Sequence, residues 1–593
     1  MVPPVIPPWT DFYTADELAA ATKIFQLYVD NDEYMRHARD NPDIANLFSL
    51  ARRAMLPTNE EFKDKRRRKK QAKKEHDSEI LAVAGIRQMR KVKMVGYLGG
   101  SVDIPMPPRI GTSEANEAFA AEEDQKLIPE IAAVEDVVME DVQKENPIEE
   151  GGADAKDGAL PAPRRLMYHR SCHVCGTLFR DLHHFYDQMC PSCAEFNFKK
   201  RFSTADMHGR VCIVTGARVK IGYAIALKLL RMGATVLVTT RFPHDAANRF
   251  AREPDFEAFT GRLAVYGLDF RDIPMLHHFC RHVQERYSRL DVIINNAAQT
   301  VRKPPAYYEH LIAGEAGGIS EQVRSIVDVV DVYRARHGGY VFGHGGGAAL
   351  TSAEAAEVEA TTTTDGSPEK VGLGVALAAK QATAHLQDVN VSAALSQLAV
   401  LESDTQVSKV QEFPPGLYDR DDQQLDLRRE NSWTMELGDI SSVEMMECHV
   451  INTFAPWVLI SELKPLMART GRLDGAVGDF DKFIVNVSAM EGQFYRNKTV
   501  FHPHTNMAKA ALNMMTRTAS AGLAAINIFM TAVDTGWITD ENPVDQWHKR
   551  EQAPPPLDEW DAAMRVLDPV LVGVRGEEKL WGCFLKNYRS TRW

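Results

Sequence analysis

Apolar and polar positions change their period between Val211 and Arg241, and this change predicts a strand, a helix and a second strand. Val211–Val214 is an apolar run of strand length, whereas Tyr223–Met232 carries apolar residues at the three- and four-residue spacing of a helix with one buried face. Gly233 ends the helix, and Thr235–Thr240 is a second, β-branched run. The stretch therefore predicts one βαβ unit.

The turn of this unit, Thr215–Gly222, has glycines where the first strand meets the helix. Glycine lets the backbone approach a phosphate closely, and the first turn of a helix presents oriented N–H groups. We therefore expect the turn to hold the pyrophosphate of a dinucleotide.

The chain after this unit continues to alternate between strand and helix patterns. This alternation predicts an α/β fold with a doubly wound parallel sheet, whose ligand lies at the carboxyl ends of the strands. The predicted strands are 261–270, 291–298, 483–488, 526–533 and a last one at FLKNY in 567–593; the predicted helices are 272–288, 441–467 and 505–521.

The alternation stops between residues 312 and 412, which contain GEAGG, HGGGAAL and TTTTDGSPEK. A segment of this length and composition is unlike the strands and helices of a sheet. We expect a low-complexity insertion outside the sheet, mostly disordered, with one helix around 371–401. The Rossmann-type domain then covers 206–593 with this insertion inside it.

Upstream of this domain the composition changes twice. Residues 1–100 favour helices, two of them between 16 and 56, and contain a basic run, Lys63–Lys74. Residues 101–164 are acidic and rich in small residues, which predicts a disordered linker. The basic run is typical of a nuclear localisation signal or a nucleic-acid contact, but also of a solvated, charged helix face. The net charge of −12 argues against general affinity for nucleic acid but leaves a local basic patch open.

A small module at 165–205 contains two CxxC pairs, Cys172/Cys175 and Cys190/Cys193, separated by fourteen residues. Two such pairs provide the four thiolates of a tetrahedral Zn²⁺ site. Four protein ligands leave no open position, so we expect the zinc to be structural. Eight cysteines in 593 residues are too few for a disulfide framework and favour a reducing compartment.

The sequence contains neither an apolar run long enough to cross a membrane nor a basic start followed by an apolar core. We therefore expect a cytoplasmic protein that does not bind membranes. A nuclear location through Lys63–Lys74 is the alternative.

From about Gly209 onward, apart from the insertion, the chain resembles the short-chain dehydrogenase/reductase family. Six features carry this resemblance in the family's order: TGARVKIG, LDF, NNAA, HVINTFAPW with Asn452, IVNVSAMEG with Ser488, and HTNMAKAALNMM with Lys509. The resemblance implies a Rossmann fold, a nicotinamide dinucleotide and hydride transfer.

The resemblance also implies which residues surround the cofactor. The turn is formed by Thr215, Gly216, Ile221 and Gly222; Asp269 contacts adenine; Asn295 and Ala297 line the cofactor; Lys509 binds the nicotinamide ribose; and Gly536 and Thr539 flank the carboxamide. A homo-oligomer is compatible with it, since related enzymes pair subunits through the two long helices after the insertion.

Two cations favour NADP(H) over NAD(H). The second strand ends at Arg241 instead of the acidic residue that binds a ribose 2′-hydroxyl, and a cation there accommodates a 2′-phosphate. Lys220 stands where the family usually has its middle glycine, and pteridine reductases carry a basic residue at a similar place. Alternatively, Lys220 strains the turn.

The catalytic positions agree with the family except at the acid. Asn452, Ser488 and Lys509 match, but the tyrosine expected four residues before the lysine is Thr505. An alkyl hydroxyl is a much weaker acid than a phenol, and general acid catalysis typically contributes about 10²–10⁴ in rate. The nearby alternatives for the acid are Tyr495, His502 and His504.

These observations lead to two hypotheses. In the first, the chain is an NADP(H)-dependent oxidoreductase of this type with altered acid catalysis, acting on a carbonyl or an activated double bond of an unknown substrate. In the second, it is a non-catalytic NADP(H)-binding scaffold that uses the zinc module and the basic run to bind a protein or nucleic acid.

Overall fold

The computed structural model describes residues 14–17, 19, 20, 22, 23, 43, 46, 59–87, 165–335, 389–405, 411–419, 421–469, 481–539, 541–543 and 554–593. The chain divides into two compact units, the first comprising residues 1–80 with 166–168 and the second comprising 81–165 with 169–593. The predicted acidic linker and nearly all of the two helices expected between 16 and 56 lie outside the described residues.

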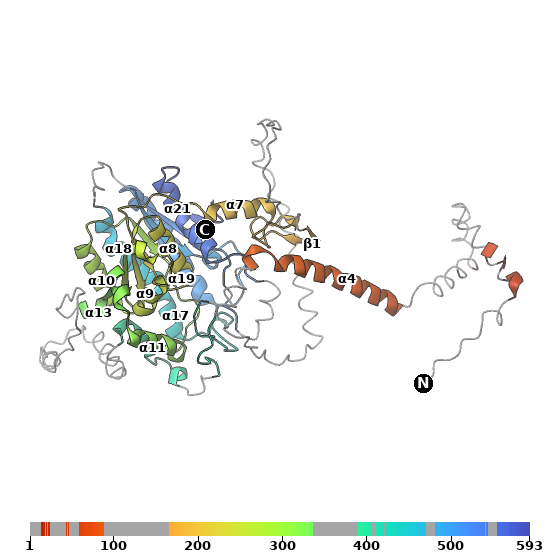
Figure 1. Cartoon of the computed structure of the whole chain (residues 1–593), viewed down its shortest axis with the longest axis horizontal. Coiled ribbons are helices and arrows are strands. Elements are labelled where there is room, and N and C mark those ends of the chain that lie inside the picture. The colour runs from red at the N-terminus through yellow and green to blue at the C-terminus, as the bar shows by residue number, and fades with distance from the viewer. Residues whose placement is uncertain are drawn as a thin grey trace, which may run out of the picture. The chain divides into compact units, whose positions relative to one another are not determined.

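The second unit is built on a nine-stranded sheet with the order β11-β10-β9-β8-β6-β3-β4-β5-β7 (Figure 1). Neighbouring strands are parallel except for the last pair, β10 and β11. The strands are β3 Val211–Thr215, β4 Thr235–Thr240, β5 Leu263–Gly267, β6 Val292–Asn295, β7 Val327–Asp331, β8 Lys482–Ser488, β9 Ile528–Asp534, β10 Phe584–Lys586 and β11 Arg589–Thr591. The predicted α/β fold with a doubly wound, largely parallel sheet is confirmed.

Helices cover both faces of this sheet. Alternate residues of β3 point to opposite sides, so Cys212 and Val214 belong to one apolar core and Val211 and Ile213 to another. The first core contains residues of α8 Lys220–Arg231, α9 Pro243–Phe250 and α21 Glu559–Val574, and the second contains residues of α10 Ile273–Arg286, α18 Ala455–Met467 and α19 Pro503–Ala524.

Shorter elements complete the described part of the second unit. They are β1 Arg165–Ser171 (its residues Leu166–Tyr168 belong to the first unit), β2 Leu178–Asp181, α7 Pro191–Arg201, η2 Phe256–Phe259, η3 Pro305–Tyr308, α11 Glu309–Gly317, α12 Glu321–Ile326, α13 Val332–Ala335, α16 Val391–Ala394, η5 Leu395–Gln397, η6 Glu402–Thr405, α17 Ser442–His449, η8 Val450–Phe454 and η9 Met490–Gly492. The first unit contains most of α4, Asn59–Ala82.

The expectation that all of 312–412 lies outside the sheet is wrong for one segment. Val327–Asp331 forms the edge strand β7, which pairs in parallel with β5. Within this strand only Val327 is buried, so the half-exposed edge has a weak apolar signal. Of the helix expected around 371–401, the described residues contain the short α16, and residues 371–388 lie outside them.

Candidate nucleotide site and metal centre

The turn between β3 and α8 is hydrogen-bonded to the residues that follow β6. The Thr215 hydroxyl accepts the backbone N–H groups of Asn296 and Ala297, both at 2.9 Å. The Asn296 side chain donates in turn to the carbonyls of Thr215 and Gly216, at 2.9 and 3.1 Å. Sequence reasoning missed Asn296, although its signal is present as the second asparagine of NNAA.

The turn has no room for side chains at its two glycines. Gly216 has a φ of +65°, and a Cβ there would lie 2.9 Å from the Cα of Ala297. A Cβ on Gly222 would lie 2.3 Å from the carbonyl oxygen of Gly216 and 2.5 Å from the Asn296 amide. The backbone is therefore packed as closely as a phosphate-binding turn requires.

Lys220, at the place of the family's middle glycine, adopts a left-handed conformation with a φ of +54°. This conformation costs a non-glycine residue roughly 1–2 kcal/mol. The turn thus keeps the backbone shape of the glycine while carrying a cation at the start of α8.

Two further cations of this region, Arg241 and Arg218, contact neighbouring side chains. Arg241, after β4, donates to the Tyr308 hydroxyl at 2.9 Å, and its guanidinium lies 4.5 Å from the centre of that ring. Arg218, inside the turn, is buried and forms an ion pair with Asp245 at 2.7 Å and a hydrogen bond with Gln423. Arg218 was not singled out from the sequence.

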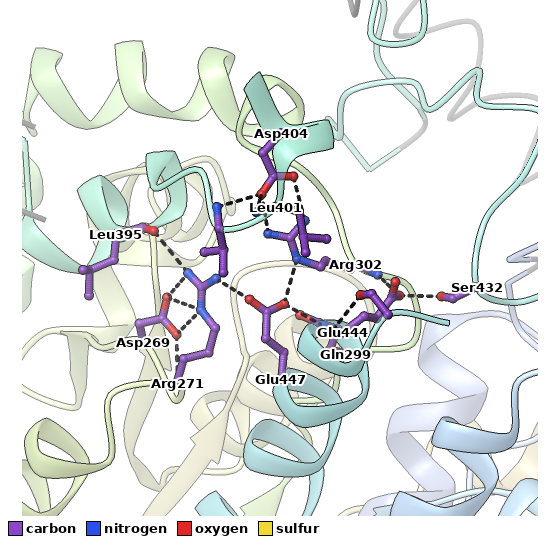
Figure 2. Close-up of polar contacts among 12 residues, drawn as sticks. Asp269, Arg271, Gln299, Arg302, Leu395, Leu401, Asp404, Ser432, Glu444 and Glu447 are labelled. Carbon is purple, nitrogen blue, oxygen red and sulfur yellow. Dashed lines mark hydrogen bonds and ion pairs between the residues drawn. The ribbon is translucent and has the colours of Figure 1, made fainter. Parts of the chain in front are cut away.

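Asp269, the residue expected to contact adenine, is bonded on both carboxylate oxygens to Arg271, the shortest distance being 2.7 Å (Figure 2). Although burial alone would raise it, the Arg271 guanidinium holds the pKa of Asp269 below its ordinary value. Arg271 also contacts Glu447 at 3.1 Å and the Leu395 carbonyl at 3.3 Å.

Residues 391–405 are joined to this network. Asp404 forms a bidentate ion pair with Arg302, with hydrogen bonds of 2.8 and 2.7 Å. Arg302 also contacts Glu447 at 3.2 Å (Figure 2). Ser392 donates to the Arg241 carbonyl at 2.9 Å, and its hydroxyl would lie 2.9 Å from a Cβ on Gly267. This segment therefore lies at the carboxyl ends of β4 and β5, where the adenosine of a dinucleotide is expected.

The two residues expected to line the cofactor have different surroundings. Asn295 is buried in the sheet, where its amide donates to the Asn486 side chain at 2.8 Å. Ala297 packs against the α-carbon side of Gly216. Ala297 is therefore beside the turn, whereas Asn295 belongs to a polar chain between β6 and β8.

Lys509 contacts the end of β8 at the residue before Ser488. The Lys509 ammonium is buried and donates to the Val487 carbonyl at 2.8 Å, and burial lowers the pKa of this ammonium. The neighbouring Ser488 hydroxyl is 2% exposed and has no hydrogen-bond partner within the described part of the chain. A buried hydroxyl without a partner is available to a ligand or a water molecule.

Asn452 lies in η8, a π-helical segment between α17 and α18. Its side chain accepts the Gln299 N–H at 2.7 Å and donates to the Gln299 carbonyl at 2.9 Å. Asn452 thereby fixes the segment that follows NNAA. Such π segments are frequent at functional sites, because they displace the helix from its regular path.

Thr505 is buried near the start of α19, and its hydroxyl lies 3.3 Å from His504 Nε2. Burial lowers the pKa of His504, so its imidazole is neutral at pH 7. Cys448, which was not singled out from the sequence, lies 3.3 Å from the Asn452 amide, and burial raises the pKa of its thiol to about 11.

Residues 210–310 match the model described as short chain dehydrogenase. Over these residues the chain is similar to the short-chain dehydrogenase/reductase family. An uncharacterized mimivirus protein, R665 of Acanthamoeba polyphaga mimivirus, is 26% identical over 433 residues, covering 70% of this chain and 73% of that protein. Mouse retinol dehydrogenase 14 is 35% identical over 102 residues, so the match spans 15% of this chain and 30% of that enzyme's length. A short chain dehydrogenase from Burkholderia cenocepacia, solved with NADP, is 16% identical with a TM-score of 0.35, covering 64% of this chain and 96% of that one.

Two of the other residues considered as the acid, His502 and Tyr495, have partners of their own. The His502 ring stacks on Trp433 with 4.2 Å between ring centres, and His502 Nδ1 lies 2.9 Å from the Trp433 carbonyl. The Tyr495 hydroxyl lies 3.3 Å from the Thr591 hydroxyl at the C-terminal end of the chain. Among the alternatives, His504 is therefore the one in contact with Thr505.

Local contacts fix the end of β9 and the segment that follows it. Asp534 accepts the Gly536 N–H at 2.8 Å and forms an ion pair with Lys586 at 3.0 Å. These two strand residues lie opposite each other in the β9–β10 register. Gly536 has a φ of +81°, and the Thr539 hydroxyl donates to Glu541 at 3.2 Å.

The four predicted zinc ligands come together. The sulfur atoms of Cys172, Cys175, Cys190 and Cys193 all lie within 4.8 Å of one another, with 3.7 Å between Cys175 and Cys190. Zn–S bonds of about 2.3 Å in a tetrahedron place sulfur atoms about 3.8 Å apart, so the four thiols fit Zn²⁺. A Cys₄ cluster able to hold a metal is thus confirmed.

The zinc module is attached to the Rossmann-type domain through buried charges. Arg201 of α7 forms a two-pronged pair with Asp558 at 2.7 and 2.9 Å and contacts Asp561 at 2.8 Å. Asp561 also accepts the Tyr186 hydroxyl, and Arg565 of α21 donates to Asn197 at 2.6 Å. Sequence reasoning missed this interface, since its partners lie more than 350 residues apart.

No helix among the described residues is long and apolar enough to span a membrane.

Proposed function

We propose that the domain binds NADP(H) and transfers hydride between the nicotinamide C4 and a carbonyl or an activated double bond. One observation carries this proposal: the phosphate turn and the Lys509–Ser488 pair lie at the same edge of one parallel sheet. Thr215 ends β3 and Ser488 ends β8, and both strands run parallel to β6 between them. Ligands of such sheets bind at the carboxyl ends of the strands.

The residues fit a dinucleotide at two of its three parts. The turn Thr215–Gly222 has the tightly packed, glycine-dependent backbone of a phosphate-binding turn, and the buried Lys509 would hold the nicotinamide ribose. At the adenosine end, Asp269 is bonded to Arg271, and Ser392 lies beside the ends of β4 and β5. The adenosine end of a dinucleotide therefore has to bind beside residues 391–405 or displace them.

The choice of NADP(H) over NAD(H) rests on charge. Arg241 follows β4, where an acidic residue would bind a 2′-hydroxyl and repel a 2′-phosphate. Lys220 adds a second cation to the phosphate turn.

We assign Thr505, with His504 beside it, to proton donation, and Ser488 and Asn452 to holding the substrate oxygen or a water molecule. A threonine hydroxyl is a weak acid and the His504 imidazole is neutral, so turnover is slow compared with an enzyme that uses a tyrosine. A bound nicotinamide supplies the hydride, and the chain positions its ribose and moves the proton.

The test is NADPH binding together with NADPH oxidation against a panel of carbonyls and enones. Lys509→Ala is expected to weaken NADPH binding at least tenfold and to abolish turnover, whereas Lys464→Ala, an exposed lysine on α18, is expected to leave both unchanged. Equal binding by Lys509→Ala and the unmodified chain would contradict the proposal.

The second candidate is a non-catalytic NADP(H)-binding scaffold. The observation that favours it is Thr505 at the position of the family's acid. NADPH oxidation distinguishes the two candidates. The scaffold binds NADPH tightly but does not oxidise it above background with any substrate, and Thr505→Ala changes neither its NADPH binding nor this lack of oxidation.

We also propose that copies of the chain associate through η8, α18 and α19. Three large apolar side chains are more than half exposed there: Phe454 at 57%, Trp457 at 59% and Met514 at 55%. Exposed apolar patches of this kind often mark an interface. Light scattering is expected to show an oligomer that Trp457→Glu dissociates and Trp581→Glu does not.

A further inference from the structure

The described part of the first unit contains a long, strongly basic helix. In α4, nine of the twelve residues from Lys63 to Lys74 are lysine or arginine, and the single carboxylate among them is Asp64. Arg66–Lys70 are exposed. This run is a concentrated positive charge in a chain whose net charge is −12.

Part of this charge borders a shallow hollow of about 490 Å³ that is open to solvent. The spacing of Arg66, Lys70 and Lys73 places them on one face of the helix. Tyr168, from the start of β1, lies at the same hollow, and the Lys73 ammonium lies 5.6 Å from the centre of its ring. The lining residues are Arg66, Arg67, Lys69, Lys70, Lys73 and Tyr168.

The helix and Tyr168 are fixed to each other by Asp77. Its carboxylate is 9% exposed and accepts the backbone N–H groups of Met167 at 2.6 Å and Tyr168 at 3.0 Å. These hydrogen bonds orient the tyrosine relative to the basic face. A merely solvated helix face would have neither this attachment nor an aromatic ring among its cations.

The side chains also indicate the chemistry of the ligand. Guanidinium and ammonium groups in a row suit a chain of phosphates. A Tyr168 ring that is 40% exposed offers a surface on which an unpaired base can stack. Membrane binding needs an apolar helix face, and Lys63–Lys74 contains Ala72 as its one apolar residue.

We propose that this face, called here the basic groove and consisting of the six lining residues, binds single-stranded nucleic acid. The cations contact successive phosphates, and Tyr168 stacks on one base. Recognition is independent of sequence, since backbone charge and stacking carry little sequence information.

The test is fluorescence anisotropy of the full chain with labelled twenty-nucleotide dT and rU strands across a salt series. Each phosphate contact on a single strand contributes about −0.7 to the slope of log K against log salt. Five cations therefore predict a slope of about −3.5, and the triple variant Arg66→Gln, Lys70→Gln, Lys73→Gln is expected to flatten it by about 2. A matched triple variant of exposed cations elsewhere, Lys199→Gln, Arg281→Gln, Lys464→Gln, is expected to keep the slope.

Tyr168 provides a readout that charge alone does not. Tyr168→Ala is expected to lower the affinity about tenfold with an unchanged salt slope, and Tyr168→Phe is expected to restore it. Circular dichroism of each variant confirms that α4 remains helical.

Three outcomes would overturn the proposal: no binding at 50 mM salt, equal binding by the two triple variants, or tighter binding to duplexes or to vesicles containing phosphatidylserine than to single strands. Lys509→Ala is expected to bind the strands normally. Failure of nucleic-acid binding is therefore distinguishable from failure of NADP(H) binding.

Discussion

Arg271 links Asp269 and Glu447 at the carboxyl edge of the sheet, at 2.7 and 3.1 Å. It thereby joins the residue expected to contact adenine to helix α17. The same Glu447 contacts Arg302, which holds Asp404 of the segment 391–405. Two arginines and three carboxylates thus tie a segment of the expected insertion to the nucleotide end of the fold.

Arg271→Leu is expected to destabilise the domain by about 3 kcal/mol, because Asp269 would stay buried without its ion-pair partner, while Glu447 would keep one ion-pair partner, Arg302. Urea unfolding measures this change. The control is Arg252→Leu, whose pair with Asp422 is exposed and is expected to contribute less than about 1 kcal/mol. Similar values for the two variants would show that the network is not energetically important.

Gly222→Ala is expected to abolish NADPH binding and to destabilise the domain by about 2 kcal/mol, because the new Cβ overlaps Gly216 and Asn296. Calorimetric titration and thermal unfolding measure the two effects. Gly314→Ala is the control: nothing outside its own helical turn lies within 4 Å of its Cβ position in α11, so it is expected to leave binding unchanged and to stabilise the domain by up to about 1 kcal/mol. Normal NADPH binding by Gly222→Ala would refute the role of the turn.

Cys190→Ser is expected to remove the metal. We expect about one zinc per chain in the purified protein, and its loss in this variant together with a lower melting temperature, since structural zinc contributes folding free energy. Cys583→Ser, outside the cluster, is expected to retain the zinc. Elemental analysis measures the zinc content of each variant. A chain that lacks zinc but keeps the melting temperature of the unmodified protein would contradict the structural role of the metal.

Arg201→Met is expected to destabilise the domain by about 3–5 kcal/mol, because Asp558 and Asp561 would remain buried without a counter-charge. Lys199→Met changes an exposed cation on the same helix and is expected to have little effect. The comparison is made by urea unfolding. If both variants matched the unmodified chain, the zinc module would not depend on this contact.

Asp404 predicts a pH dependence. Burial acts to raise the pKa of its carboxyl, but the bonds from Arg302 and two backbone N–H groups lower it to about 2. Its stabilising effect is therefore fully present well above the unfolded pKa near 3.8 and is lost as the pH falls through the folded value. At pH 6 the free energy of unfolding of the unmodified chain is expected to be about 2 kcal/mol higher than that of Asp404→Asn. This difference is expected to halve near pH 3. A constant difference across this range would exclude the ionised pair as its cause.

The elements predicted from the sequence are those whose signals are local. The apolar run of β3, the periodicity of α8 and the cysteine spacing each depend on a few neighbouring residues, and the fold and the Cys₄ cluster follow from them. The weakly buried β7 was missed, because its apolar signal is short and lies next to low-complexity sequence.

The polar networks were not predictable. On the sequence, Arg201 and Lys199 are equivalent cations near the end of one helix, yet one is buried and the other exposed. Their difference comes from α21, whose Asp558 lies 357 residues further along the chain. The roles of Thr505, Ser488 and Lys509 remain predictions, because packing and burial do not specify which atoms take part in a reaction.

The contact between α7 and α21 has a consequence for biosynthesis. Arg201 is synthesised 357 residues before its partner Asp558. Asn197 is synthesised 368 residues before its partner Arg565. At typical elongation rates of about 5–20 residues per second, the ribosome needs on the order of tens of seconds after the zinc module to reach α21. The Arg201 side chain of the nascent zinc module therefore lacks this partner until α21 has been synthesised, and a chaperone or an acidic factor that shields it during this interval would raise the yield of folded protein.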